Sequence, residues 1–121
     1  MKIETFHNVL LAIAGALGVF LRYHIGKWIN FTSLPIATVF VNTIGCFLLG
    51  YLFVRYAHSN PTVYVILGIG FCGGFTTFST FTLDIYTLFT NHLYTQLIVY
   101  ISLSIILGIL GLLLGIYIAK S

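Results

Sequence analysis

The stretch from Gly70 to Asp84 holds the residues best suited to chemistry, and it reads Gly-Phe-Cys-Gly-Gly-Phe-Thr-Thr-Phe-Ser-Thr-Phe-Thr-Leu-Asp. A glycine pair is followed by hydroxyl side chains and spaced phenylalanines, in the middle of an apolar segment long enough to span a membrane. Because no water reaches the hydrocarbon core, backbone that leaves helical pairing there must be buried in protein or line a wet cavity. We therefore predict a spanning helix broken at Gly73-Gly74, and the break indicates an ion or substrate pathway.

Four phenylalanines, Phe71, Phe75, Phe78 and Phe81, recur at spacings of four, three and three, which predicts one helical face. Such a stripe is more often core packing than a binding surface. Here hydroxyl residues are interleaved with it, namely Thr76, Thr77, Ser79, Thr80 and Thr82. Phenyl edges carry partial positive charge, so ring edges and hydroxyl donors together can meet a small anion without a lysine that would hold it too tightly.

Three further polar residues lie within apolar segments, where polar groups are costly to insert. The Asn42 amide serves either a pathway or a helix–helix hydrogen bond, and the sequence weighs the two equally. Arg22 is either an anchor reaching the interface or a vestibule charge that attracts anions. Asp84 is the only acid within a span, and it either pairs with a cation or lies close enough to the interface to be hydrated.

The last apolar segment contributes Tyr100, Ser102 and Ser104. The two serines are two residues apart, so they cannot share a helical face. Ser104 is four residues from Tyr100 and is the better candidate to line a pathway with it. A serine hydroxyl that bonds back to its own helix is the commoner arrangement.

Composition indicates the elements that position these residues. The chain has 121 residues, of which 60% are hydrophobic and only 6% charged, far below the roughly one quarter expected of a soluble domain. Four apolar stretches reach the roughly 20 residues needed to cross the hydrocarbon core. We predict an all-α, multi-pass protein of the cell membrane, a single domain over residues 1–121, with spans at 9–28, 34–56, 63–89 and 93–118.

The five cations are scattered along the chain, so the net charge of +3 forms no patch for nucleic acid. With four spans, Lys2, Arg55 and Lys120 lie on one side of the membrane and Arg22 and Lys27 on the other. Three cations against two is a weak orientation signal, so the chain is a candidate for insertion both ways.

Four helices do not easily enclose a pathway and also bury a broken helix. We therefore expect a homo-oligomer, and a twofold dimer is the commonest closed form. If two copies meet in opposite orientations, their broken helices cross near the bilayer midplane, where unpaired carbonyls from both can share a cation.

Over nearly its whole length the chain resembles the small fluoride channels called Fluc or CrcB. The most specific likeness is the run from Gly73 to Phe81. Gly15-Ala16-Leu17-Gly18 leading to Arg22-Tyr23 is similar to the family's first-helix pattern. The segment from Thr38 to Asn42, followed by Gly45, Phe47 and Gly50, is similar to the second.

The resemblance implies an antiparallel, dual-topology dimer with two separate fluoride pores. It implies a structural sodium ion at the dimer centre, held by backbone carbonyls of Gly73 and Thr76 from each subunit. It also implies pore roles for Asn42, Phe78, Phe81, Thr80 and Tyr100. The family commonly has Glu where Asp84 stands and Gly where Ala37 stands, so this chain has the shorter acid.

These observations together predict a fluoride-specific channel that lowers cytoplasmic fluoride by passive export. Its subunit partner is a second copy or a paralogous chain. A small dual-topology multidrug or cation antiporter is one alternative, but it wants a glutamate embedded in the first span, and residues 9–28 contain no acid. A non-transporting membrane assembly subunit is another, and it leaves the broken helix without a purpose. No nucleophile–base pair or metal-ligand cluster in the sequence supports an enzyme.

Overall fold

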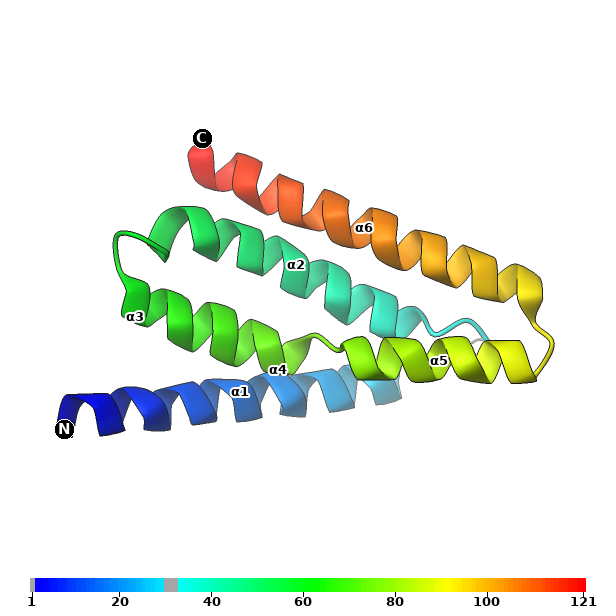
Figure 1. Cartoon of the computed structure of the whole chain (residues 1–121), viewed down its shortest axis with the longest axis horizontal. Coiled ribbons are helices and arrows are strands. Elements are labelled where there is room, and N and C mark those ends of the chain that lie inside the picture. The colour runs from blue at the N-terminus through cyan, green and yellow to red at the C-terminus, as the bar shows by residue number, and fades with distance from the viewer. Residues whose placement is uncertain (1, 30–32) are drawn as a thin grey trace.

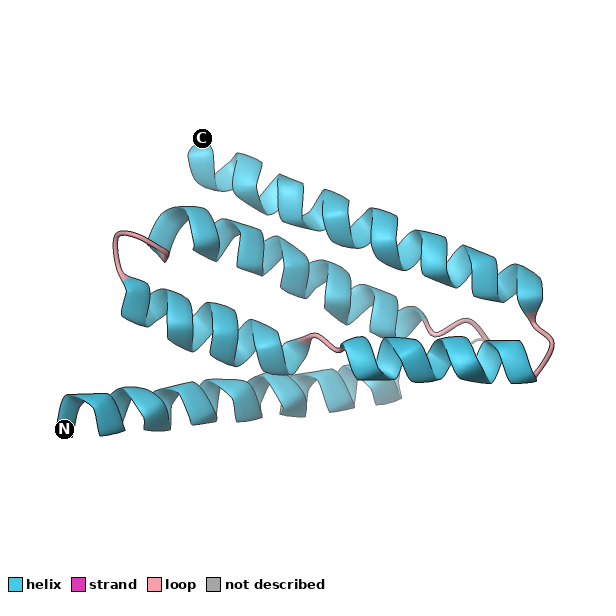
Figure 2. Ribbon diagram, in the orientation of Figure 1, coloured by secondary structure: helices cyan, strands magenta, loops and turns pink. Residues whose placement is uncertain are grey.

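The computed structural model describes residues 2–29 and 33–121, and these residues form helices and short connections without a strand. Figures 1 and 2 show an elongated bundle in which the helices run roughly along one axis. In chain order, the helices are α1 (Lys2–Trp28), α2 (Ile36–Tyr56), α3 (Pro61–Val63), the π-helical η1 (Tyr64–Cys72), α4 (Gly73–Phe75), α5 (Phe78–Thr90) and α6 (Tyr94–Lys120).

Four helical segments are long and apolar enough to cross a membrane: Lys2–Trp28, Ile36–Tyr56, Pro61–Thr90 and Tyr94–Lys120. The prediction of a multi-pass membrane protein with four spans is therefore confirmed. The helix α1 begins at Lys2, seven residues before the apolar stretch that we predicted as the first span. Glu4 lies in its first turn, where the positive end of the helix dipole stabilises a carboxylate.

The third span consists of two helical rods. α3, η1 and α4 follow one another without interruption from Pro61 to Phe75, and α5 continues after a gap at Thr76 and Thr77. Its first turn is set by the sequence Asn60-Pro61, because the Asn60 side chain accepts a hydrogen bond from the Val63 amide at 3.3 Å. Proline suits this first helical position, where no intrahelical donor is needed.

Glycines allow α2 and α6 to pack closely. A Cβ added at Gly50 would overlap the Leu112 carbonyl, and one added at Gly115 would overlap the Phe47 carbonyl. Small residues let membrane helices approach at the backbone, where dispersion replaces the missing hydrophobic driving force. Gly108, Gly111 and Gly115 thus form a small-residue face of α6 that packs against α2 within the chain.

A second glycine seam joins α1 to the first half of the third span. A Cβ at Gly18 would overlap the Phe71 carbonyl, and one at Gly74 would overlap the Gly15 carbonyl. Close packing at this crossing fixes the height of α4 along α1.

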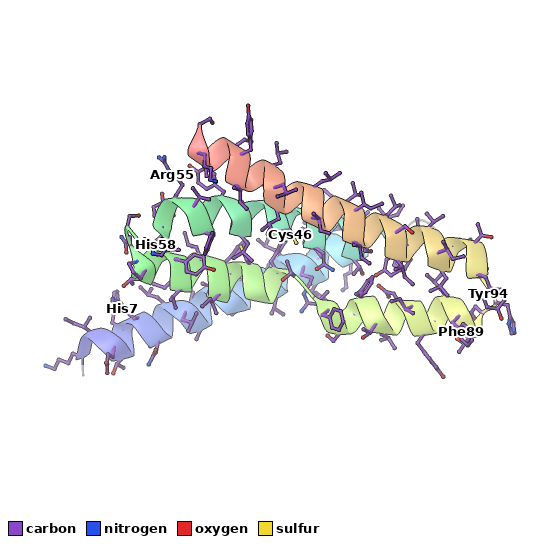
Figure 3. All side chains as sticks on the ribbon, turned by 45° about the horizontal axis from the view of Figure 1, so that its top comes forward. His7, Cys46, Arg55, His58, Phe89 and Tyr94 are labelled. Carbon is purple, nitrogen blue, oxygen red and sulfur yellow. The ribbon has the colours of Figure 1, made fainter. Side chains whose placement is uncertain are left out.

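Both chain termini lie at the same end of the bundle (Figure 1), as an even number of spans requires. Figure 3 shows Arg55, His58 and His7 near this end, and Phe89 and Tyr94 at the opposite end. The break in the third span lies between the two ends.

Candidate functional site

The break in the third span is at Thr76 and Thr77, two residues beyond the glycine pair that we predicted. Thr76 has φ −91° and ψ 160°, and Thr77 has φ −151° and ψ 121°, so both are extended. Gly73 is helical, with φ −62° and ψ −38°. The predicted position was wrong because Gly74 serves close contact with α1, while the break depends on side chains that replace the lost helical pairing.

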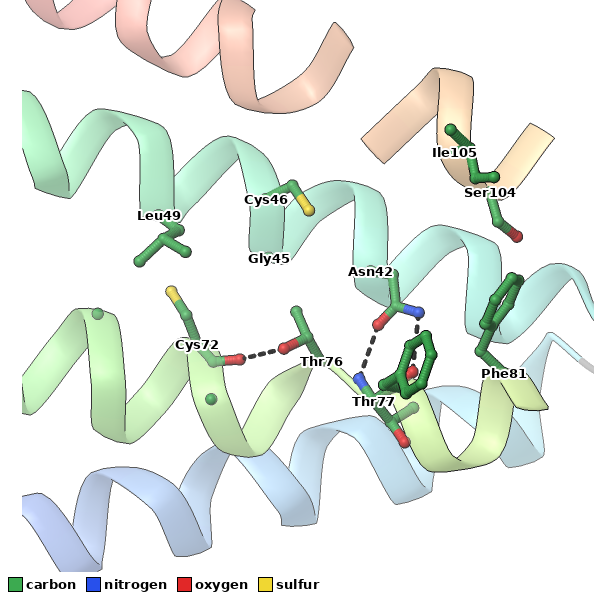
Figure 4. Close-up of a pocket in the computed structure, with 13 residues that line it drawn as sticks. Asn42, Gly45, Cys46, Leu49, Cys72, Thr76, Thr77, Phe81, Ser104 and Ile105 are labelled. Atoms are coloured by element: carbon green, nitrogen blue, oxygen red, sulfur yellow. Dashed lines mark hydrogen bonds between the residues drawn. The ribbon is translucent and has the colours of Figure 1, made fainter. Parts of the chain in front are cut away.

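Asn42 of α2 bridges the break. Its Nδ2 donates to the Thr77 carbonyl at 3.0 Å, and its Oδ1 accepts from the Thr77 amide at 2.7 Å (Figure 4). In a continuous α-helix the Thr77 amide would donate to the Gly73 carbonyl. Asn42 therefore satisfies Thr77 and deprives the Gly73 carbonyl of its helical donor.

Thr77 also begins the second rod. Its Oγ1 accepts from the Thr80 amide at 3.1 Å, which is a helix N-cap. In a continuous helix that amide would donate to the Thr76 carbonyl, so this carbonyl also loses its helical donor.

Arg22 of α1 reaches the same break from the other side. Its Nε donates to the Gly74 carbonyl at 3.1 Å. In an unbroken helix the Phe78 amide would donate to this carbonyl. Four carbonyls lose their helical donors at the break, those of Gly73, Gly74, Phe75 and Thr76. Arg22 donates to the one at Gly74, and those of Gly73 and Thr76 are left for other partners.

Two half-helix ends therefore face each other across Thr76 and Thr77. The end of α4 presents carbonyls and partial negative charge, and the start of α5 presents amides and partial positive charge. A cation is attracted to the carbonyl end and an anion to the amide end. Broken membrane helices commonly bind ions at such ends.

The larger cavity at the break, of about 400 Å³, is lined by residues of α2, the third span and α6 (Figure 4). Six residues that we predicted for the site line it: Asn42, Gly73, Thr76, Phe78, Phe81 and Ser104. Its other lining residues include Cys46 and Cys72. Ser104 Oγ is buried and has no hydrogen-bond partner among the described residues, whereas Ser102 is exposed.

A second cavity, of about 280 Å³, lies between α1, α2 and the start of α5. It holds Arg22 and Lys27 together with the hydroxyl residues Thr38, Thr77 and Thr80. Thr77 lines both cavities, so the Asn42–Thr77 bridge lies between them. Sequence reasoning placed Lys27 on the same side of the membrane as Arg22 but did not predict that it lines this cavity.

The four phenylalanines do not form the single stripe that we predicted, because extended residues separate them. Phe71 and Phe75 stack with their ring centroids 5.6 Å apart on the first rod. Phe78 and Phe81 approach at 5.8 Å on the second. Phe75 is buried, while Phe78 is 76% exposed in the single chain and available to a neighbour.

Asp84 and Tyr100 form a hydrogen-bonded group with Thr38. The hydroxyls of Thr38 and Tyr100 both donate to Asp84 Oδ2, each at 2.8 Å. Tyr100 is fully buried, and its ring lies 5.4 Å from that of Phe81. Asp84 thus has two hydroxyl partners, where sequence reasoning considered a cation or water. Thr38 was also not among the predicted site residues.

The chain matches the sequence model of a family described as "CrcB-like protein, Camphor Resistance (CrcB)" over residues 9–116. It is 39% identical over 117 residues to a protein of Phocaeicola vulgatus called fluoride-specific ion channel FluC, covering 93% of this chain and 97% of that one.

Two further relatives bear similar names. One is fluoride-specific ion channel FluC 1 of Streptococcus pneumoniae, 39% identical over 109 residues, with 89% of this chain and 95% of the relative covered. The other is fluoride-specific ion channel FluC 2 of Bacillus cereus, 40% identical over 112 residues, with coverages of 88% and 92%. With the family match spanning nearly every described helix, the chain belongs to the CrcB family.

Proposed function

We propose that this protein is a fluoride channel and that it exports fluoride passively across the cell membrane. The relatives named as fluoride-specific ion channels support the ion, and the helical spans support the membrane. The observation that carries the proposal is the break at Thr76 and Thr77, which opens onto two cavities. Side chains hydrogen-bond the Thr77 backbone and the Thr80 amide there, while the Gly73 and Thr76 carbonyls keep no helical donor. A channel function accords with the family, and no enzymatic activity is proposed.

The fluoride path passes the start of α5. Arg22 and Lys27 make the second cavity attractive to anions, and the amide end of α5 favours negative charge. Beyond Thr77, the larger cavity offers Asn42, the Ser104 hydroxyl and the ring edges of Phe78 and Phe81. These neutral donors can replace water around a small anion without trapping it, as conduction requires.

Thr80 and Tyr100 hold supporting positions on this path. Thr80 Oγ1 accepts from Thr77 Oγ1 at 3.1 Å and lines the second cavity. Tyr100 packs behind Phe81 and bonds Asp84, which ties α5 to α6 beside the path.

The direction of export follows from the chemistry of fluoride. Fluoride enters cells as the neutral acid and is trapped as the anion in a less acidic cytoplasm. A passive conductor of the anion then lets the membrane potential drive it out.

The assembly we propose is an antiparallel dimer of this chain, or of this chain and a paralogue. Phe78 and the open side of the larger cavity are exposed in one chain, and a second copy would cover them. Opposite orientations would bring together the two breaks.

A structural sodium ion fits this dimer centre. Gly73 and Thr76 line the larger cavity and have carbonyls that lack helical donors. Nothing lies within 4 Å of where a Cβ of Gly73 would be, so an ion or partner can approach. Among the described residues no three His, Cys, Asp or Glu side chains gather to hold a metal, so backbone oxygens are the ligands at hand, and they suit a hard cation. When bound, the ion would supply positive charge between the carbonyls of two subunits.

Liposomes loaded with fluoride and chloride test the ion choice. After a potassium shunt is added, we expect rapid fluoride loss and retained chloride, followed with ion-selective electrodes. Comparable chloride loss would contradict fluoride selectivity. Reporters fused after Ser121 should appear on both membrane faces, and a single face without a coexpressed partner would contradict the dual topology.

Sodium is tested separately. We expect that rigorously sodium-free buffer abolishes flux or dissociates the dimer. Undiminished flux and assembly without sodium would remove this ion from the proposal and leave the channel function standing.

A further inference from the structure

Arg22 donates to the Gly74 carbonyl beside the break, and the break lies between the two ends of the bundle, so an anchor at the membrane interface does not account for this contact. Arg22 is part of the seam that packs α1 against the first rod of the third span. Gly15, Gly18 and Arg22 are spaced by three and four residues, so they share one face of α1. Gly15 and Gly18 admit the backbone of that rod, and Arg22 meets it where it ends.

The chemistry of this end favours a guanidinium group. The last carbonyls of a helix carry partial negative charge, and a cation there is stabilising. A hydrogen bond from a charged donor is worth more than one between neutral groups, most of all where water is scarce. The planar guanidinium donates through Nε at a fixed angle, which the single ammonium of a lysine does not reproduce.

We propose that Arg22 is a positioning residue that fixes the end of the first rod, and that its charge in the cavity is secondary. By taking the Gly74 carbonyl, it sets the rotation of α4, and this rotation directs the Gly73 carbonyl to the larger cavity. Arg22 and Asn42 thereby hold the break from opposite sides. The inference rests on the proposed function, since it assigns Arg22 to the scaffold of the proposed pore and sodium site.

The experiment compares Arg22→Lys, Arg22→Ala and Lys27→Gln with the wild type in fluoride efflux at low and high ionic strength. Lys27 lines the same cavity and contacts the Tyr23 ring, so its variant removes a neighbouring charge and leaves the Gly74 contact intact. We expect Arg22→Lys to lose flux about tenfold or more at both ionic strengths, because the charge is kept but the bond is lost. Lys27→Gln should lose flux at low salt and regain most of it at high salt, where exposed charges are screened.

Chemical rescue of fluoride flux distinguishes a positioning role from a purely electrostatic or packing role, because added guanidinium would restore flux only in the first case. Arg22→Ala leaves space beside a cavity that already exists, and added guanidinium should restore flux while methylammonium does not. Arg22→Lys with wild-type flux, or an Arg22→Ala loss that salt abolishes and guanidinium does not repair, would overturn the proposal.

A measurement without flux separates this inference from the channel function. Hydrogen exchange of the peptide covering residues 70–80 should quicken in Arg22→Lys and remain unchanged in Lys27→Gln, in the purified, assembled protein. If the wild type conducts no fluoride, the proposed function fails, and this exchange still decides the role of Arg22. Unchanged exchange in Arg22→Lys would overturn the positioning role whatever the flux.

Discussion

Asn42 and Thr77 exchange two hydrogen bonds across the break, so one side chain of α2 replaces the backbone pairing that the third span loses. The same exchange frees the Gly73 carbonyl, whose helical donor would be the Thr77 amide. A residue whose sequence position suggested either a pathway or a helix–helix bond thus makes the second kind of bond while it lines the cavity. The Asn42 side chain therefore both holds the broken backbone and lines the larger cavity.

Replacing Asn42 with Asp should lower fluoride flux about tenfold or more. The carboxylate can still accept from the Thr77 amide, but it has no proton for the Thr77 carbonyl and repels it. Efflux from liposomes measures the loss, and size-exclusion chromatography reports the assembly.

Thr43→Val is the matched control for this change. The Thr43 hydroxyl bonds the Val39 carbonyl of its own helix at 2.7 Å, so its loss leaves the break untouched. Flux should remain within about twofold of wild type, since local hydroxyl bonds of this kind contribute little. Equal losses in the two variants would show that any polar change in α2 is harmful and that the bridge is not special.

Phe78 and Phe81 are tested by replacement with Ile, which keeps apolar bulk and removes the ring quadrupole. If their edges meet fluoride, flux should fall sharply in either variant while the dimer still forms. Phe81→Ile should also lower the midpoint of thermal unfolding slightly, because Phe81 packs on the Tyr100 ring.

The control for the ring variants is Phe71→Ile, on the first rod and stacked on Phe75. It should change flux much less. If the three variants lose dimer and flux together, the rings are structural and have no pore role. Intact flux in both Phe78→Ile and Phe81→Ile would contradict the pore role equally.

Much of the architecture could be predicted from the sequence. Length and apolarity predicted the four spans. The glycine pair followed by hydroxyl residues predicted that the third span is broken. These features are local, so a residue's type and its neighbours in the chain suffice to predict them.

The position of the break and the partners of Asp84 could not be predicted in this way. Gly73-Gly74 has the composition of a helix breaker, yet in the lipid-covered bundle these glycines remain helical because Gly74 must contact α1. Asp84 bonds Thr38, 46 residues away, and Tyr100, 16 residues away. Such partners depend on the register of α2, α5 and α6 against one another, and no local pattern encodes that register.

The hydroxyl pair on Asp84 makes a prediction about stability. Tyr100→Phe and Thr38→Val should each destabilise the protein by about 1 kcal/mol, a typical cost for one hydrogen bond between membrane helices. In a cycle with Asp84→Ala, which removes the acceptor, the Tyr100→Phe cost should shrink, because the two residues share the bond. Thermal unfolding in detergent measures these values. Strict additivity of the two changes would show that the bond contributes nothing.

Gly18→Ala should prevent correct assembly. Its Cβ would overlap the Phe71 carbonyl and lie 2.7 Å from the Phe75 amide nitrogen, and neither backbone atom can move without separating α1 from the first rod. Gly26→Ala, in the same helix with nothing within 4 Å of the added Cβ, should instead be neutral or stabilising by up to about 1 kcal/mol. Dimer yield and thermal unfolding of both variants check the contrast, and a folded, active Gly18→Ala would disprove the close crossing.

Gly73→Ala should affect the single chain and the dimer differently. Gly73 is helical and exposed, and an added Cβ would meet nothing within 4 Å, so one chain tolerates alanine and gains helix propensity. If a second copy packs at the open side of the larger cavity, the same methyl group would lie in the dimer contact and hinder approach to the Gly73 carbonyl. We therefore expect a normally folded monomer that dimerises weakly and needs more sodium for the flux that remains. Circular dichroism, chromatography at several detergent dilutions and a sodium titration of efflux measure the three effects. A Gly73→Ala protein with wild-type dimer stability and sodium dependence would show that the partner lies elsewhere.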